Sequence, residues 1–175
     1  MRIDVWSDFR CPHCREGKRH LERALREFEH RDRVQVVWRS FEIDPSAPAK
    51  RSTFDAHRLL HLASSLEQRA GLSERFMRAA VEEDATLSDH PTLVRLAREA
   101  GLSEANVRDV LACDRFADAV RADRCDGEQA GVYAVPTFVI DGAVATAGAQ
   151  PPEALWMLME YAWSVGDGRS VEVRK

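Results

Sequence analysis

The stretch WSDFRCPHCREG (residues 6–17) places two cysteines, Cys11 and Cys14, three positions apart in a chain of 175 residues. Pro12 and His13 stand between them. Such a pair is explained by a metal site, by a redox pair or by a coincidence of composition. The segments on either side of the pair help to decide among the three.

The flanking segments predict a strand, a helix and a second strand. Residues 2–6 (RIDVW) alternate in polarity, residues 12–29 carry apolar side chains at spacings of three and four, and residues 34–41 (VQVVWRSF) are rich in β-branched and aromatic residues. A strand–helix–strand unit favours a parallel strand pair. The cysteine pair therefore follows a strand and begins a helix.

This position is the usual context of a redox motif. Free N–H groups and the helix dipole at a helix N-terminus favour negative charge, and they lower the pKa of a thiol there to about 3.5–7.5. Pro12 fits the first turn, where its missing N–H is not needed. His13 adds a positive charge or a hydrogen bond, and Cys14 lies on the same helix face as Cys11. The second thiol can therefore attack the mixed disulfide that the first one forms.

Metal binding is the weaker explanation of the pair. Structural zinc usually takes four ligands, typically as two close pairs, and this chain has one close pair. Cys113 and Cys125 are twelve positions apart in helical patterns, so we expect packing thiols there and not a second disulfide. His57 and His61 are one helical turn apart without an evident third ligand, so we expect packing and polar contacts from them. The prediction is that no metal is bound.

The remaining segments predict a block of helices followed by a hairpin and a closing helix. Residues 44–50 form a proline-containing loop, and the patterns between 52 and 131 are all helical, with Gly71 expected to end one helix. Strands are expected at 135–141 and 143–148, joined by a DG turn, and an amphipathic helix at 150–163. The last residues (167–175) fit either an edge strand or a tail.

Pro136 stands at the start of the predicted strand 135–141. Proline within a central strand is disfavoured because it cannot donate to the ladder. A cis bond between Val135 and Pro136 explains its place, and so does an ordinary edge-strand proline. The spacing alone leaves both explanations open.

Taken together, these segments resemble the DsbA-like branch of the thioredoxin superfamily. The resemblance is to the FrnE-like proteins, which are related to 2-hydroxychromene-2-carboxylate isomerases. The stretches that carry it are DVWSDFRCPHC (4–14), VVWRSFEIDP (36–45), TFDAHRLLHLA (53–63), VPTFVIDG (135–142) and GAQPPEAL (148–155).

The resemblance implies an α/β thioredoxin fold with an inserted all-helical domain. Its expected parts are residues 1–47, a helical insertion at 48–131, and residues 132–175. It further implies that Cys11 is the exposed nucleophile, that Cys14 resolves the mixed disulfide, and that a cis Pro136 with Val135 lines the substrate groove. The segment between 45 and 53 is shorter than in FrnE-like proteins, which predicts a more open site.

The leading functional prediction is a thiol–disulfide oxidoreductase that acts on protein or small-thiol substrates without a further cofactor. A glutathione-dependent isomerase or transferase on the same fold is the chief alternative, although such relatives generally carry serine where Cys11 stands. A third alternative is a non-catalytic chaperone or partner-binding module.

Charge and composition limit the other partners. The net charge is −4 with both signs mixed along the chain and no basic cluster, so nucleic acid is not expected. No apolar run approaches the roughly 18 residues of a membrane span. With Met1 as the natural start and no signal peptide, we expect a cytoplasmic protein. The oligomeric state is left open.

Two acidic residues flank the pair. Asp4, in the first predicted strand, is either a buried proton acceptor or, by preference, a solvent-facing position. Asp8 either caps the helix or tunes Cys11, and capping is the preferred interpretation.

Overall fold

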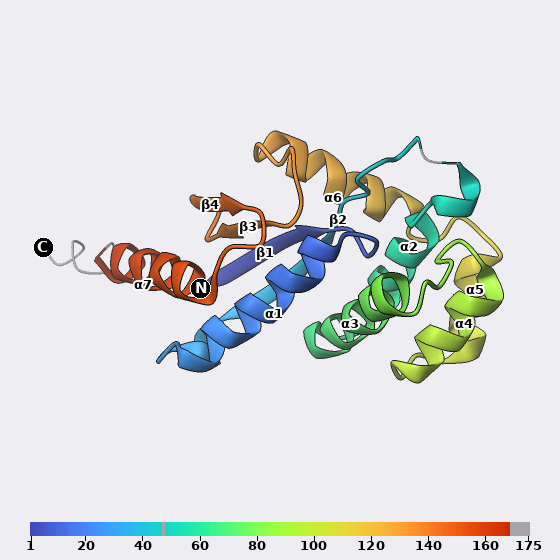
Figure 1. Cartoon of the computed structure of the whole chain (residues 1–175), viewed down its shortest axis with the longest axis horizontal. Helices are drawn as coiled ribbons and strands as arrows, with labels where there is room; N and C mark the ends of the chain where they lie inside the picture. The colour runs from blue at the N-terminus through green and yellow to red at the C-terminus, as the bar shows by residue number, and fades with distance from the viewer. Residues whose placement is uncertain (47, 169–175) are drawn as a thin grey trace, which may run out of the picture.

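A four-stranded mixed sheet forms the centre of the protein (Figure 1). The computed structural model describes residues 1–46 and 48–168. The strand order is β2-β1-β3-β4, and the strands are β1 (Arg2–Ser7), β2 (Gln35–Ser40), β3 (Thr137–Ile140) and β4 (Val144–Ala147). β1 and β2 are parallel, which confirms the predicted strand–helix–strand unit, whereas β1–β3 and β3–β4 are antiparallel.

Helices cover both faces of this sheet. Alternate residues of β1 point to opposite sides, and β1 carries buried apolar side chains on each side, so each face packs against helices. Ile3 and Val5 belong to the core that includes α1 (Pro12–Glu27) and α7 (Pro152–Gly168). Trp6 points to the other face, where its indole Nε1 donates to the Asp123 carbonyl of α6 (Ala117–Gln129) at 2.7 Å. Figure 1 shows the sheet between α6 and α1.

Between β2 and β3 the described residues form helices and no strand. After a 3₁₀ turn (Ala49–Arg51), these are α2 (Phe54–Leu62), α3 (Leu66–Glu82), α4 (His90–Glu99), α5 (Glu104–Leu111) and α6. A second 3₁₀ turn (Arg31–Arg33) precedes β2. The predicted thioredoxin fold with a helical insertion is thus confirmed. The boundaries at 48 and 131 stay predictions, because one continuous core includes Ile3 and Val5 of the sheet and Leu59 and Phe76 of the helices.

The expected helix end at Gly71 is wrong. The chain leaves the helix at 63–65, and Gly71 lies inside α3. Ser65 is the N-cap of α3, and its side chain accepts a hydrogen bond from the Gln68 backbone at 3.1 Å. An N-cap serine satisfies an otherwise free N–H group, and it therefore fixes where the new helix begins.

The hairpin and the closing helix agree with the prediction apart from their ends. Asp141 and Gly142 both have positive φ, and Ala143 donates its N–H to the Ile140 carbonyl at 3.1 Å, as a two-residue hairpin turn requires. β3 begins at Thr137 and not at 135, and α7 runs further than the predicted 163. Of the segment 167–175, residues 167 and 168 end α7, and the rest lies outside the described residues. Within the part of the chain described, no helix is both long and apolar enough to cross a membrane.

Candidate active site

Cys11 is the N-cap of α1 and lies at the junction between the sheet and the helical block. Its backbone is extended (φ −89°, ψ 112°), and its Sγ atom accepts a hydrogen bond from the Cys14 N–H at 3.3 Å. Pro12 occupies the first helical turn, as expected. The sulfur thus takes the place of the oxygen with which a serine or aspartate caps a helix.

Cys14 lies one turn further into the helix and is completely buried. The backbone N–H of Asp8 donates to its Sγ atom at 3.5 Å. Both thiols are free in this structure. Cys11 is 6% exposed, so it is the more accessible of the two, but it is buried and not the exposed nucleophile that the resemblance implies. The more open site stays a prediction.

The pKa values of the two thiols are shifted in opposite directions. The pKa of Cys11 is lowered from 9.0 to about 6, chiefly by a hydrogen bond from the Cys14 side chain, although burial opposes the shift. The N–H groups of Cys14 and His13 and the charge of His13 lower it further. Burial raises the pKa of Cys14 far above its ordinary value, and the neighbouring Cys11 adds to this effect. Cys11 is therefore the thiolate of the pair, and Cys14 is the thiol.

His13 acts on Cys11 from an exposed position. Its side chain is 75% exposed, and its Nδ1 atom lies 3.9 Å from the Glu16 carboxylate. Solvent thus screens the charge of the ring. His13 also lowers the pKa of Cys11 through its backbone N–H, which lies at the helix N-terminus.

The bond between Val135 and Pro136 is cis, which confirms the prediction. The loop faces the cysteine pair, because the Sγ atom of Cys11 lies 3.7 Å from the Val135 carbonyl oxygen. Close packing holds the loop there: a Cβ atom added to Gly17 of α1 would lie 2.9 Å from Cγ of Pro136. The role of Val135 and Pro136 in binding substrate stays a prediction.

The site contains one residue, Phe9, whose role the sequence did not reveal. Phe9 is fully buried, and its ring stacks on His57 of α2 with centroids 4.3 Å apart. It also meets Phe76 of α3 edge-on at 5.4 Å. Phe9 thus anchors the segment between β1 and the cysteine pair on the inserted helices through the contacts of a large buried aromatic ring.

Both expectations for the acidic residues need correction. Cys11, and not Asp8, is the N-cap, and the Asp8 carboxylate accepts hydrogen bonds from the backbone of Arg10 and Ile43. Asp4 is not solvent-facing. Its carboxylate is 13% exposed and pairs with Arg2 and Arg39 at 2.8 Å.

Cys113 and Cys125 are exposed, so the prediction that they are packing thiols is wrong. Cys113 follows the end of α5, and Cys125 lies on the outer side of α6. The Nε2 atom of His61 lies 3.1 Å from the Asp123 carboxylate, and His57 is buried against Phe9. The two histidines thus make the polar and packing contacts that we expect from the sequence. Among the described residues, no group of three or more His, Cys, Asp or Glu is arranged to hold a metal.

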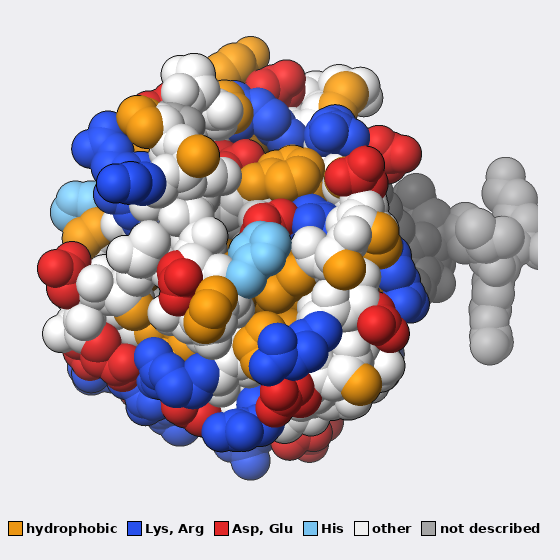
Figure 2. Space-filling view, turned by 90° about the vertical axis from the view of Figure 1, so that its right-hand side faces the viewer, with side chains coloured by type: hydrophobic (Ala, Val, Ile, Leu, Met, Phe, Trp, Pro, Cys, Tyr) orange, Lys and Arg blue, Asp and Glu red, His pale blue; other side chains and the backbone are white. Residues whose placement is uncertain are grey.

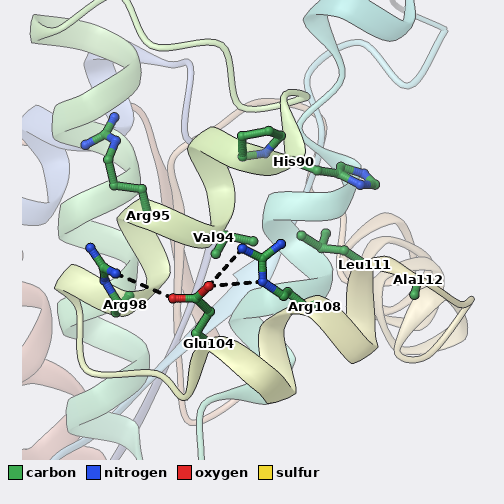
Figure 3. Close-up of a pocket in the computed structure, with 9 residues that line it drawn as sticks. His90, Val94, Arg95, Arg98, Glu104, Arg108, Leu111 and Ala112 are labelled. Atoms are coloured by element: carbon green, nitrogen blue, oxygen red, sulfur yellow. Dashed lines mark hydrogen bonds and ion pairs between the residues drawn. The ribbon is translucent and has the colours of Figure 1, made fainter.

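A separate cavity of about 490 Å³ lies between α4 and α5. Figure 2 views the molecule from the side of these helices, and it shows apolar side chains in a hollow surrounded by charges of both signs. Figure 3 shows that Glu104 there binds Arg98 and Arg108, at 3.5 and 2.8 Å. The residues lining this cavity include no thiol, so the candidate chemistry stays at Cys11.

A thioredoxin-like sheet with two cysteines at the start of its first helix and a cis-proline facing them defines a class of thiol–disulfide oxidoreductases. The model of the DSBA-like thioredoxin domain matches residues 2–159, and the chain belongs to this family.

Similar proteins agree with this assignment. A probable DsbA oxidoreductase from Streptomyces coelicolor is 36% identical, with 94% of this chain and 90% of that chain covered and a TM-score of 0.88. An uncharacterized protein of Bacillus subtilis, YwbO, is 27% identical over 82% of this chain and 88% of its own length. A 2-hydroxychromene-2-carboxylate isomerase has a TM-score of 0.74 over both entire chains, but at 11% identity it shows the fold alone.

Proposed function

We propose that the protein exchanges disulfides with protein or small-molecule thiol substrates through Cys11 and Cys14. The observation that carries this proposal is the difference between two neighbouring thiols. Cys11 has a pKa of about 6 at a helix N-terminus, and Cys14 is a buried thiol one turn away. At pH 7 Cys11 is therefore largely thiolate, which is the attacking species in exchange.

The reaction follows from this arrangement in two steps. The Cys11 thiolate attacks one sulfur of a substrate disulfide, the substrate disulfide breaks, and the other half of the substrate leaves as a thiolate. Cys14 then loses its proton and attacks the Sγ atom of Cys11, which forms the Cys11–Cys14 disulfide and releases the second substrate thiol. The protein is oxidised and the substrate is reduced by two electrons, and the reverse sequence oxidises a dithiol.

The loop before Pro136 suits binding of an extended substrate. The Val135 carbonyl lies 3.7 Å from the Cys11 sulfur. A backbone segment that pairs with Val135 would thus bring its own cysteine against Cys11, in the manner of strand addition. Main-chain pairing does not depend on side chains, so this arrangement favours substrates of many sequences.

An isomerase function has weaker support. Such an enzyme holds a thiol without exchanging it, so it would have no use for the resolving thiol at Cys14. The fold likeness to the 2-hydroxychromene-2-carboxylate isomerase does not separate the two functions.

Serine substitutions test the proposal. Cys11→Ser should abolish reduction of insulin by dithiothreitol, and Cys14→Ser should accumulate mixed disulfides that a non-reducing gel resolves. Cys113→Ser is the matched control, because it removes an exposed thiol away from the pair, and it should leave the rate unchanged. Normal insulin reduction by the Cys11→Ser variant would exclude the proposal.

A further inference from the structure

The cavity between α4 and α5 is built from one face of each helix. The α4 residues that line it recur within one turn of each other, and they are His90, Pro91, Val94, Arg95 and Arg98. The α5 residues that line it follow the same kind of spacing, and they are Glu104, Arg108, Leu111 and Ala112. Such spacings place side chains on one side of a helix. The cavity has a volume of about 490 Å³, which is typical of a small-molecule site between helices.

The turn between the two helices fixes these faces relative to each other. Gly101 has a φ of +85°, and the Leu102 N–H donates to the Ala97 carbonyl at 3.0 Å. This is the hydrogen bond of a Schellman turn, which ends α4 and redirects the chain. The opposite sides of both helices are packed into the core, where Leu93 of α4 and Val107 of α5 are fully buried. The cavity is therefore formed by two anchored helices and not by a loop.

Part of the cavity wall is apolar. Val94 is 7% exposed, Leu111 is half-buried, and Pro91 and Ala112 are exposed. An apolar group that enters the cavity would remove this surface from water, as well as its own, and such burial is favourable. The wall thus suits a ligand with an apolar body.

The same cavity is lined by three arginines and by a single carboxylate. Glu104 accepts hydrogen bonds from Nε and Nη2 of Arg108, at 3.0 and 2.8 Å, and from Nη1 of Arg98 at 3.5 Å. Figure 3 shows the two guanidinium groups on opposite sides of this carboxylate. The hydrogen bond from Arg108 lowers the pKa of Glu104, so Glu104 is ionised at neutral pH. One negative charge therefore faces three positive charges, in a chain whose net charge is −4.

The carboxylates of neighbouring helices do not cancel this excess. Arg95 donates to Glu99 at 2.9 Å, but Glu99 also accepts from Arg75 of α3 at 2.7 Å, so it is shared between two cations. The Nε2 atom of His90 lies 2.9 Å from the Asp55 carboxylate of α2, which occupies the ring and leaves the arginines unaffected.

The arginines have further N–H groups with which to bind an anion. Among the described residues, Nη2 of Arg98 and Nη1 of Arg108 make no hydrogen bond. The planar guanidinium fork matches the geometry of a carboxylate, and hydrogen bonds between the two are stronger than those between neutral groups. Two such forks beside an apolar wall define both ends of a ligand.

We propose that the cavity between α4 and α5 binds a small organic carboxylate that has an aliphatic or aromatic body. The ligand carboxylate accepts hydrogen bonds from Arg98 and Arg108, and the body packs against Val94 and Leu111. The cavity wall holds no thiol, so this binding goes beyond disulfide exchange and is independent of Cys11.

A pair of fluorescent probes tests the charge of the ligand. 1-Pyrenebutyrate carries a carboxylate on an aromatic body, and 1-pyrenebutanol has the same body without the charge. Fluorescence titration of the full chain should show that the carboxylate binds about tenfold more tightly or better. Arg98→Gln and Arg108→Gln should each weaken binding of the carboxylate by about fivefold or more, and should leave binding of the alcohol within about twofold.

Arg23→Gln is the matched control for the arginine variants. Arg23 lies 3.8 Å from Glu27, four positions away on α1, as Arg108 pairs with Glu104 four positions away on α5. The substitution removes the same charge and the same kind of ion pair outside the cavity, so it should leave both affinities unchanged. Glu104→Gln should act in the opposite direction and strengthen binding of the carboxylate by about threefold, because Glu104 competes for both guanidinium groups.

The signs of these effects decide the inference. Equal affinities for the two probes, or equal weakening by Arg23→Gln and Arg108→Gln, would overturn it. Weaker carboxylate binding in Glu104→Gln than in the parent would overturn it as well. Cys11→Ser should bind 1-pyrenebutyrate as the parent does, and loss of binding in this variant would place the probe at the thiol pair instead. Thermal unfolding followed by circular dichroism checks that each variant is folded, and all of the substituted arginines are exposed.

Discussion

The Sγ atom of Cys11 lies 3.7 Å from the carbonyl oxygen of Val135, although the two residues are 124 positions apart in the chain. The contact joins the start of α1 to the cis-proline loop before β3. The pairing of β1 with β3 brings the two segments together, since Trp6 lies opposite Thr137. The site thus depends on the sheet register as well as on the local motif.

The lowered pKa of Cys11 predicts alkylation at mildly acidic pH. The rate of reaction of Cys11 with iodoacetamide should rise with pH and reach half its maximum near pH 6, because the thiolate is the reacting form. Peptide mapping after brief labelling identifies the residue. Cys14→Ala should move the midpoint upward, because the hydrogen bond from Cys14 is the largest cause of the shift. Preferential labelling of Cys14 would reverse the assigned roles.

The same thiolate predicts a dependence of stability on pH in the reduced protein. The folded pKa of about 6 lies below the ordinary thiol value of 9.0, so the unfolded state binds more protons between these limits. The contribution of Cys11 to stability is therefore complete above about pH 9 and is lost as the pH falls through 6. Urea unfolding of the reduced protein should show this rise, and the Cys11→Ser variant should lack it.

Two helix glycines should respond to alanine with opposite signs. Gly17→Ala places a Cβ atom 2.9 Å from Pro136 and 3.1 Å from Phe138, so we expect a loss of about 1–3 kcal/mol from overpacking. Gly71→Ala in α3 meets no atom within 4 Å and should stabilise the protein by about 0.5–1 kcal/mol. Urea denaturation measures both. Equal changes in the free energy of unfolding for the two variants would show that the Pro136 loop moves to accommodate the added methyl group without cost.

The contrast between these glycines also shows what the sequence predicts and what it leaves out. The order of strands and helices follows from hydrophobic period, and the cysteine pair follows from its place after a strand. Gly71 does not end a helix, because α2 already ends at Leu62 and the Ser65 N-cap begins α3 six positions before Gly71. The stacking of His57 on Phe9 joins residues of different elements, and no spacing rule reveals such a contact. The exposure of Cys113 and Cys125 likewise depends on which helix face the neighbours cover.

Burial of His57 predicts loss of stability in acid. Its folded pKa of about 4 lies below the unfolded value of 6.5, so the unfolded state binds more protons between these limits. Stability should therefore decline as the pH falls from about 6.5 to 4, by on the order of 3 kcal/mol. His57→Phe keeps an aromatic ring on Phe9 and removes the titration. Thermal unfolding as a function of pH should show a shallower acid decline in this variant; an identical decline would assign it to other groups.

Asp123 should be the acidic residue on α6 on which the fold most depends. It is 2% exposed, and its carboxylate accepts hydrogen bonds from Arg39 at 2.7 Å, the Ser40 N–H at 2.9 Å and His61 at 3.1 Å. Burial by itself would raise the pKa of Asp123. The hydrogen bonds from His61, Ser40 and Arg39 outweigh this effect and lower the pKa. One buried carboxylate thus joins α6 to β2 and α2.

Asp123→Asn should therefore cost about 3 kcal/mol, because an amide cannot accept from three donors that include a charged guanidinium, and the loss leaves buried donors unpaired. Asp126→Asn makes the same chemical change one turn further along α6, at an exposed position, and should leave the unfolding midpoint in urea unchanged. Insulin reduction at low temperature should survive in both variants, because Asp123 lies on the face of the sheet opposite α1. A stable Asp123→Asn variant would mean that Arg39 finds sufficient pairing with Asp4 alone, at 2.8 Å.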